Sequence, residues 1–167
     1  KNCVFSYHVL TGPTGGVIAV TNTQGTFSIE GSVFDHCAAS QGCIAVYLEG
    51  GGGTVTIANN TVVDNGRGNA GVAGMDIRLS GAQVLQNIVT GCDIGIKSSM
   101  SPNSIRCNDV WDNGMNYSGI GDQTDRNGNI SLDPLFCRSL PGPLAYVPQA
   151  GSPCLPETFP PASSTIS

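Results

Sequence analysis

The sequence predicts an all-β domain built from stacked repeats, and three observations lead to this prediction. A phrase of similar residues returns five times, starting at residues 3, 32, 60, 87 and 108, so the repeats are 29, 28, 27 and 21 residues long. Short runs that favour strands occur in the repeats, and we find no stretch with the 3.6-residue period of an amphipathic helix. Self-similarity at this period is typical of units that stack on one shared core.

The first predicted strand of each repeat lies within the phrase itself. Each phrase opens with a small polar residue, and an apolar residue follows two positions later. These apolar residues are predicted to point inward and to lie above one another, and they are Phe5, Phe34, Val62, Val89 and Val110.

A second strand is predicted in four of the repeats, at residues 17–20, 44–46, 75–77 and 94–96. Apolar residues alternate there with small or polar ones, which indicates strands with one buried face. Residues such as Asn59, Asn60, Asn65 and Gly66 tolerate the left-handed backbone of sharp bends between strands.

The polar residue that opens each phrase has a structural interpretation. Stacking places equivalent residues about 4.8 Å apart, so their side chains can hydrogen-bond from repeat to repeat. We therefore predict an internal ladder, rather than a catalytic group, formed by Ser32, Asn60, Asn87 and Asn108.

Several segments resemble secreted bacterial proteins of the right-handed parallel β-helix family. They are N-N-T-V-V-D-N at 59–65, I-R-C-N-D-V-W-D-N at 105–113, and a closing pair, G-N-I-S-L-D-P-L-F-C at 128–137 and A-G-S-P-C at 150–154. The resemblance implies one β-helix domain of about five coils over residues 1–155, with a closing segment at 129–154. It leaves the activity open, because such proteins include pectate- and alginate-lyase-like enzymes as well as adhesins.

The remaining residues, 156–167, are rich in Pro, Ser and Thr and are expected to form a tail or linker. Because the chain opens at Lys1 inside a repeat, we expect either that a leader was removed or that an upstream portion exists.

The seven cysteines suggest disulfides, because the composition is poor in charge and typical of extracellular proteins. The family resemblance implies a Cys137–Cys154 bridge, and Cys37 and Cys43 bracket a loop short enough for a second bridge. A Cys37–Cys92 bridge is excluded, because two repeats separate the residues by roughly 9.6 Å, beyond the reach of a disulfide. For each of the remaining cysteines two alternatives stay open, a disulfide bridge or a buried thiol; these residues are Cys3, Cys92 and Cys107.

Composition also excludes some classes of protein. A net charge of −5 argues against general nucleic-acid binding, which needs a basic face. No apolar run approaches 18 residues, so no membrane span is expected.

The best candidate for ligand binding is an outward column predicted from the second strands. Tyr47, Arg78 and Lys97 each follow an inward apolar residue, so they are expected to align on one outer face. An aromatic ring with two cations can hold a sugar ring or an anionic group. The alternative is that these are ordinary solvated residues. No carboxylate pair recurs in one column, so a two-acid glycosidase site is not supported.

No cofactor is predicted, and the one calcium candidate matches its motif poorly. Asp122, Asp125 and Asn127 lie in a segment similar to a calcium loop, but Gln123 replaces an expected Asp and Pro134 replaces the final Glu. A simple turn explains the segment equally well. His8 and His36 lie in neighbouring repeats without a third ligand, so no metal site is expected there.

Two functions are compatible with these patterns. The favoured one is a non-catalytic extracellular β-helix that acts as a structural, adhesive or self-associating surface protein, with filament formation as one form of self-association. The alternative is a carbohydrate-active protein, either a polysaccharide lyase that uses Tyr47, Arg78 and Lys97 or a carbohydrate-binding module. A small, acidic chain would repel an acidic polysaccharide, which weighs against the lyase.

Overall fold

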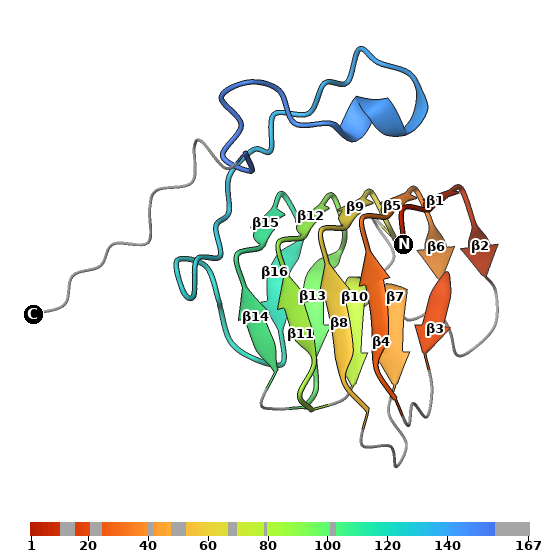
Figure 1. Ribbon diagram of the computed structural model, residues 1–167, viewed down its shortest axis with the longest axis vertical. Helices are drawn as coiled ribbons and strands as arrows, with labels where there is room; N and C mark the ends of the chain where they lie inside the picture. Colours follow the sequence, from red (N-terminus) through yellow and green to blue (C-terminus); the bar gives the residue numbers. More distant parts are fainter. Residues whose placement is uncertain are drawn as a thin grey trace, which may run out of the picture.

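The computed structural model describes residues 1–10, 16–20, 25–39, 42–47, 53–66, 70–78, 80–100 and 103–155. In this part of the chain the fold is all-β, and its strands form parallel sheets in which neighbouring strands come from successive repeats (Figure 1). Sheet 1 contains β1 (Val4–Ser6), β5 (Val33–Asp35), β9 (Thr61–Val63), β12 (Ile88–Thr90) and β15 (Asp109–Trp111).

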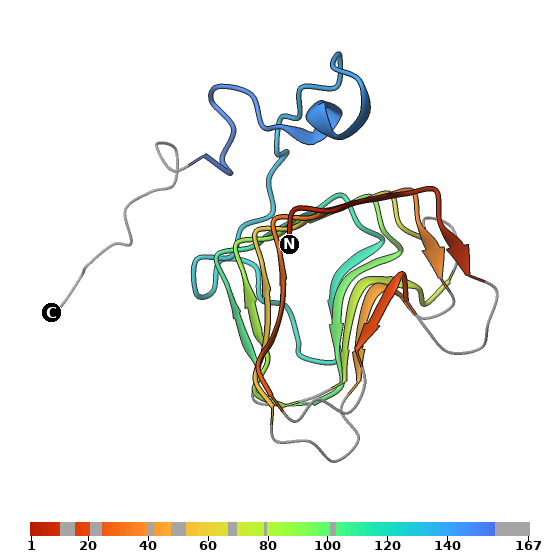
Figure 2. The ribbon, with the colours of Figure 1, turned by 45° about the vertical axis from the view of Figure 1, so that its right-hand side comes forward.

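Two further sheets complete the stack. Sheet 2 contains β3 (Ile18–Val20), β7 (Gly42–Tyr47), β10 (Ala73–Arg78), β13 (Ile94–Ser98) and β16 (Met115–Ser118). Sheet 3, a series that the sequence pattern did not single out, contains β4 (Phe27–Glu30), β8 (Val55–Ala58), β11 (Gln83–Leu85) and β14 (Ser104–Arg106). A short pair joins β2 (Val9–Leu10) to β6 (Ala38–Ala39). Figure 2 shows the sheets arranged around a common interior.

The core is built from columns of apolar residues that face this interior. The predicted register of sheet 1 is confirmed, with one paired column of Phe5, Phe34, Val62, Val89 and Val110. The rings of Phe5 and Phe34 stack with their centroids 4.9 Å apart. Residues from all three sheets join the same buried cluster, for example Val62, Ile77 and Ile57. Each such side chain contributes about 1.5–3 kcal/mol through burial, so stacking supplies the core that no single repeat has.

The register of sheet 2 differs from the prediction. Met75 pairs with Ile96, whereas the apolar pattern had placed it opposite Ile94. Because side chains alternate with a period of two, shifting a strand by two residues keeps the same residues facing inward. The pattern alone therefore does not distinguish the two alignments.

Two columns of sharp corners separate the sheets. At the first corner, between sheets 3 and 1, the residue before each ladder position has a left-handed backbone, with φ of 56° at Asn59, 54° at Gln86 and 55° at Cys107. The second corner follows sheet 1 and has the same conformation at His36 and Asp64. At the first corner, two residues turn the chain out of a sheet 3 strand and into the following sheet 1 strand.

The polar ladder runs along the first corner through buried hydrogen bonds. Asn87 Oδ1 accepts bonds of 3.0 Å from the backbone N–H and from the side-chain amide of Asn60, and Asn108 Oδ1 accepts equivalent bonds from Asn87. Ser32 begins this series, and Asn129 extends it one repeat further than the sequence predicted. A second ladder at the other corner pairs cysteine with asparagine, because Cys37 N–H donates to Asn65 and Cys92 N–H donates to Asn113.

Most of the closing segment lies outside sheet 1. Its first residues extend the sheet, because Ile130 bridges Asp109 in parallel. The chain then leaves the stack, forms the 3-10 helix η1 (Gly142–Tyr146) and returns, with an antiparallel bridge between Phe136 and Pro148. Figures 1 and 2 both show this blue segment beyond the row of sheet 1 strands.

The predicted Cys137–Cys154 disulfide is not formed, since both residues are thiols. The segment is held by other contacts instead, including a hydrogen bond of 2.7 Å from Ser152 Oγ to the Pro134 carbonyl and one of 3.1 Å from Cys154 Sγ to Asp109. The Cys37–Cys43 pair lies outside the described residues, because the Cys43 side chain is not among them. The tail at 156–167 also lies outside them.

Candidate functional site

The predicted column of Tyr47, Arg78 and Lys97 is wrong at Lys97. Arg78 pairs with Tyr47 in the register of β7 and β10, but Lys97 pairs with Asp76 and lies two positions away from Arg78 along the strands. The cause is the shifted register of sheet 2. The Tyr47 side chain is not among those that the structure describes, so its direction stays a prediction.

Arg78 is engaged by a carboxylate of its own strand. Its Nη2 lies 2.7 Å from Asp76 Oδ2, and its Nε lies 3.2 and 3.1 Å from the two carboxylate oxygens. The Asp76 side chain is fully buried. A substrate carboxylate would have to compete with this contact, and removing Arg78 from a buried carboxylate is costly.

A polar cluster that the sequence did not predict joins the closing segment to sheet 1. Asp35 accepts a hydrogen bond from the Tyr146 hydroxyl at 2.5 Å and also contacts His36 Nδ1. His36 Nε2 lies 3.8 Å from Asp64, and Tyr7 stacks on the imidazole with centroids 5.2 Å apart. Burial, followed by the contact with Asp35, raises the pKa of Tyr146, so the hydroxyl stays a donor.

The calcium candidates lie in an exposed turn. Asp122 Oδ1 accepts the backbone N–H of Thr124 at 2.9 Å, and this bond lowers the pKa of Asp122. Asp125 and Asn127 have left-handed backbones, with φ of 61° and 52°. No group of three or more His, Cys, Asp or Glu residues suited to a metal ion occurs in the described ranges. Calcium binding here stays a prediction.

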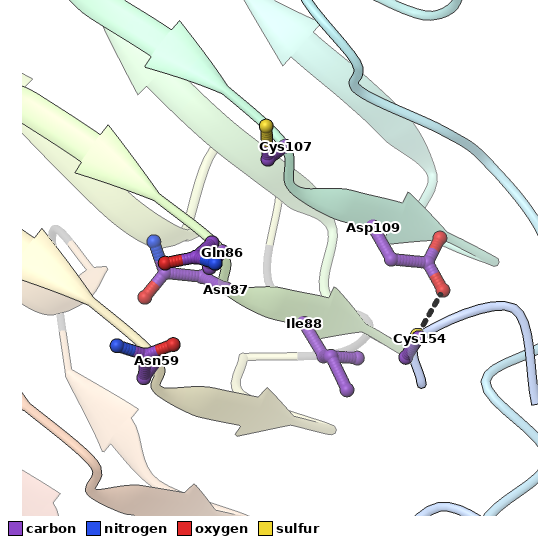
Figure 3. A pocket seen from close by; sticks show the side chains of 7 residues that line it. All are labelled: Asn59, Gln86, Asn87, Ile88, Cys107, Asp109 and Cys154. Carbon is purple, nitrogen blue, oxygen red and sulfur yellow. Dashed lines mark hydrogen bonds between the residues drawn. The ribbon is translucent and has the colours of Figure 1, made fainter. Parts of the chain in front are cut away.

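A cavity of about 440 Å³ lies between the first corner and the closing segment (Figure 3). We call it the Asp109 cavity. Its lining combines outer residues of sheet 1, left-handed corner residues and the end of the closing segment, and consists of Asn59, Gln86, Asn87, Ile88, Cys107, Asp109 and Cys154. Its volume lies within the range of about 300–1,000 Å³ that is usual for small-molecule sites.

Asp109 is the buried acid of this cavity, with only 3% of its surface exposed. Oδ1 accepts the backbone N–H of Leu132 at 3.1 Å, and Oδ2 accepts the Cys154 thiol at 3.1 Å. Burial raises the pKa of Asp109 to about 6, although both hydrogen bonds act in the opposite direction. Burial also raises the pKa of the Cys154 thiol, and the neighbouring Asp109 adds to this, so Cys154 is a poor nucleophile.

The corner residues supply the other polar groups. Asn59 and Gln86 occupy equivalent positions in successive repeats, and both side chains are exposed. Within the described residues, neither carboxamide hydrogen-bonds another side chain or the backbone. Asn87 differs, because its amide is already used in the ladder, where it donates to the Ile57 carbonyl and to Asn108.

One pattern in the sequence indicates part of this site. Asn59, Gln86 and Cys107 each precede a ladder asparagine, so their common position in the repeat indicated that they share a corner. Asp109 carried no comparable signal, because its burial depends on contacts with Leu132 and Cys154, far along the chain.

In the described part of the chain, no helix has both the length and the apolar character needed to span a membrane. Comparison with protein-family models found no match for this sequence, and searches of the curated proteins and of the solved structures found no match either.

Proposed function

We propose that this chain is a right-handed parallel β-helix that acts outside the cell as a non-catalytic, self-associating structural or adhesive protein. The parallel sheets, whose neighbouring strands lie one repeat apart, support the β-helix. A right-handed path is favoured, because crossover connections between parallel strands of one sheet are right-handed in about 98% of cases. The charge-poor composition, with 11% charged residues, supports an extracellular location.

The edge strands of the described sheets are the observation that supports self-association. Strands β1, β3 and β4 each end their sheet, and all three lie on the same side of the stack. Edge strands offer backbone N–H and C=O groups to another chain. None of the three contains Lys or Pro, residues that commonly block edges. Val4 and Tyr7, on and beside β1, are 50% and 70% exposed in the described chain.

This edge makes a second copy of the chain a suitable partner. If the edge of one copy meets the opposite end of another, the contact does not close, and a filament results. The closing segment leaves that opposite end partly accessible, because β14 and β16 also lie at the ends of their sheets.

Light scattering combined with negative-stain electron microscopy tests the proposal. We expect assemblies whose mass grows with concentration, and we expect Val4→Lys to return the protein to a monomer by placing a charge on the edge. Leu144→Lys is the matched control, because Leu144 is 53% exposed but lies on η1, outside the sheets. A wild-type protein that stays monomeric at all concentrations and shows no lines or filaments would contradict self-association.

The lyase alternative has lost the aligned column on which it depended. Lys97 is separated from Arg78 in the register, and Arg78 is bound to Asp76. If a lyase site nevertheless exists, Lys97→Ala should abolish the rise in ultraviolet absorbance that unsaturated uronates produce from pectate or alginate. Carbohydrate binding without catalysis does not depend on this column, because the Asp109 cavity is lined by other residues.

A further inference from the structure

We infer that the Asp109 cavity binds a neutral saccharide of one or two sugar residues. This inference goes beyond the proposed structural role and does not depend on it, because the cavity lies within one copy of the chain. A protein that is monomeric but binds sugar would refute self-association and leave this inference intact.

The cavity presents hydroxyl-binding groups from three places. The carboxamides of Asn59 and Gln86 each offer both donors and an acceptor, and the protein does not use them within the described residues. Asp109, a residue that is 3% exposed, adds a carboxyl group, and each of its oxygens has capacity for another hydrogen bond. The two amides and the acid line the cavity on opposite sides of Ile88, so a polyhydroxylated ligand lying across Ile88 would meet polar groups at both ends.

The spacing of the amides suits a sugar ring. Asn59 and Gln86 lie on successive repeats, so their backbones are separated by about 4.8 Å. Two amides at this separation can reach hydroxyl groups on opposite sides of one pyranose. Ile88 lies between them and Asp109 in Figure 3 and offers an apolar surface to the C–H face of the ring.

The charge of the cavity selects a neutral ligand over an acidic one. Its lining contains no Lys, Arg or His that could pair with a uronate or a phosphate. Asp109 is the one carboxyl group of the lining, and its negative charge above pH 6 would repel an anion. The ligand inferred for this cavity is therefore neutral, whereas the predicted column with Arg78 and Lys97 would have bound an acidic polysaccharide.

Variants that remove the amides without straining the corner test the inference. Gly suits the left-handed backbone, and Gly31 and Gly128 already occupy the equivalent corner position in other repeats, with φ of 63° and 74°. Gln86→Gly and Asn59→Gly should therefore fold normally. Asn2→Gly is the matched control, because Asn2 has the same conformation (φ 56°) in the same column but does not line the cavity.

Binding is measured by saturation-transfer difference NMR and calorimetry with glucose, galactose, N-acetylglucosamine, cellobiose, galacturonate and glucosamine. We expect at least one neutral sugar to bind, with a tenfold or greater loss of affinity in Gln86→Gly and in Asn59→Gly and no change in Asn2→Gly. The inference is overturned if no neutral sugar binds at tens of millimolar. It is also overturned if both amide variants bind like the wild type, or if galacturonate or glucosamine binds more than tenfold tighter than every neutral sugar.

Discussion

At the scale of single residues, Asp109 links the stability of the fold to pH. Its pKa is about 6 in the folded chain, compared with 3.8 for an unperturbed aspartate. A raised pKa means that the folded state holds the proton more tightly than the unfolded state. The resulting stabilisation is fully present below pH 4 and is lost as the pH rises through 6. The shift corresponds to about 3 kcal/mol at most.

Replacing the acid by its amide should remove this dependence. Asp109→Asn keeps an acceptor for the Leu132 N–H but does not titrate. We expect the free energy of unfolding of the wild type, relative to the variant, to fall by about 2–3 kcal/mol between pH 4 and pH 7. Urea unfolding at several pH values measures it. Asp125→Asn, at an exposed turn, should retain the wild-type slope. Equal slopes for the wild type and Asp109→Asn would show that burial does not perturb this group.

The contrast between Asn87 and Asp109 explains what the sequence could predict about single residues. Asn87 could be predicted because the same residue type recurs at the same position of neighbouring repeats, and the ladder follows from that recurrence. Asp109 occurs once, and its environment is created by Leu132 and Cys154. Contacts made outside the repeat leave no periodic trace in the sequence.

At the scale of elements, the closing segment is attached to sheet 1 at two distant points. Cys154 contacts Asp109 on β15, and Tyr146 contacts Asp35 on β5, a residue 111 positions earlier in the chain. The segment therefore spans from the last repeat back to the second one. The Tyr146 ring also meets Phe136 edge-on, with centroids 5.6 Å apart, so the hydroxyl is held by packing within the segment.

Tyr146→Phe tests whether this contact fastens the segment. The ring is kept, and only the hydroxyl that donates to Asp35 is lost, which should cost about 1.5–3 kcal/mol because the acceptor is charged. We expect faster hydrogen exchange of the backbone amides at residues 136–148, measured by mass spectrometry. Tyr7→Phe should change exchange little, because Tyr7 is 70% exposed. Unchanged protection in Tyr146→Phe would indicate that the Asp109 contact alone holds the segment.

Sheets 1 and 2 show why the register of some strands was predicted correctly and that of others was not. The strands of sheet 1 are anchored at both ends by polar residues at corners, so their register follows from the phrase. Strand β10 has no such marker, and its apolar residues Ala73, Met75 and Ile77 allow two alignments with β13. Only the packing of the whole sheet selects one, and the predicted column of Tyr47, Arg78 and Lys97 failed for this reason.

At the scale of the molecule, the ladder at the first corner holds successive repeats in register. The ladder from Ser32 to Asn129 connects successive levels of this corner, and Cys3 N–H joins it by donating to Ser32 Oγ. In every asparagine of the ladder, the side-chain oxygen accepts a hydrogen bond from one repeat and the side-chain amide donates a hydrogen bond to another. Losing one member therefore leaves buried polar groups unpaired in two repeats.

Asn87→Ala should show how far the stack depends on this series. The substitution removes the acceptor of the Asn60 N–H and the donor to the Ile57 carbonyl, both of them buried. At about 1–3 kcal/mol for each unpaired group, we expect a loss of about 2–5 kcal/mol in the free energy of unfolding, measured by urea denaturation. Asn59→Gly, one repeat earlier and exposed, should cost far less. A loss below 1 kcal/mol in Asn87→Ala would mean that apolar packing, without the ladder, is enough to keep the repeats in register.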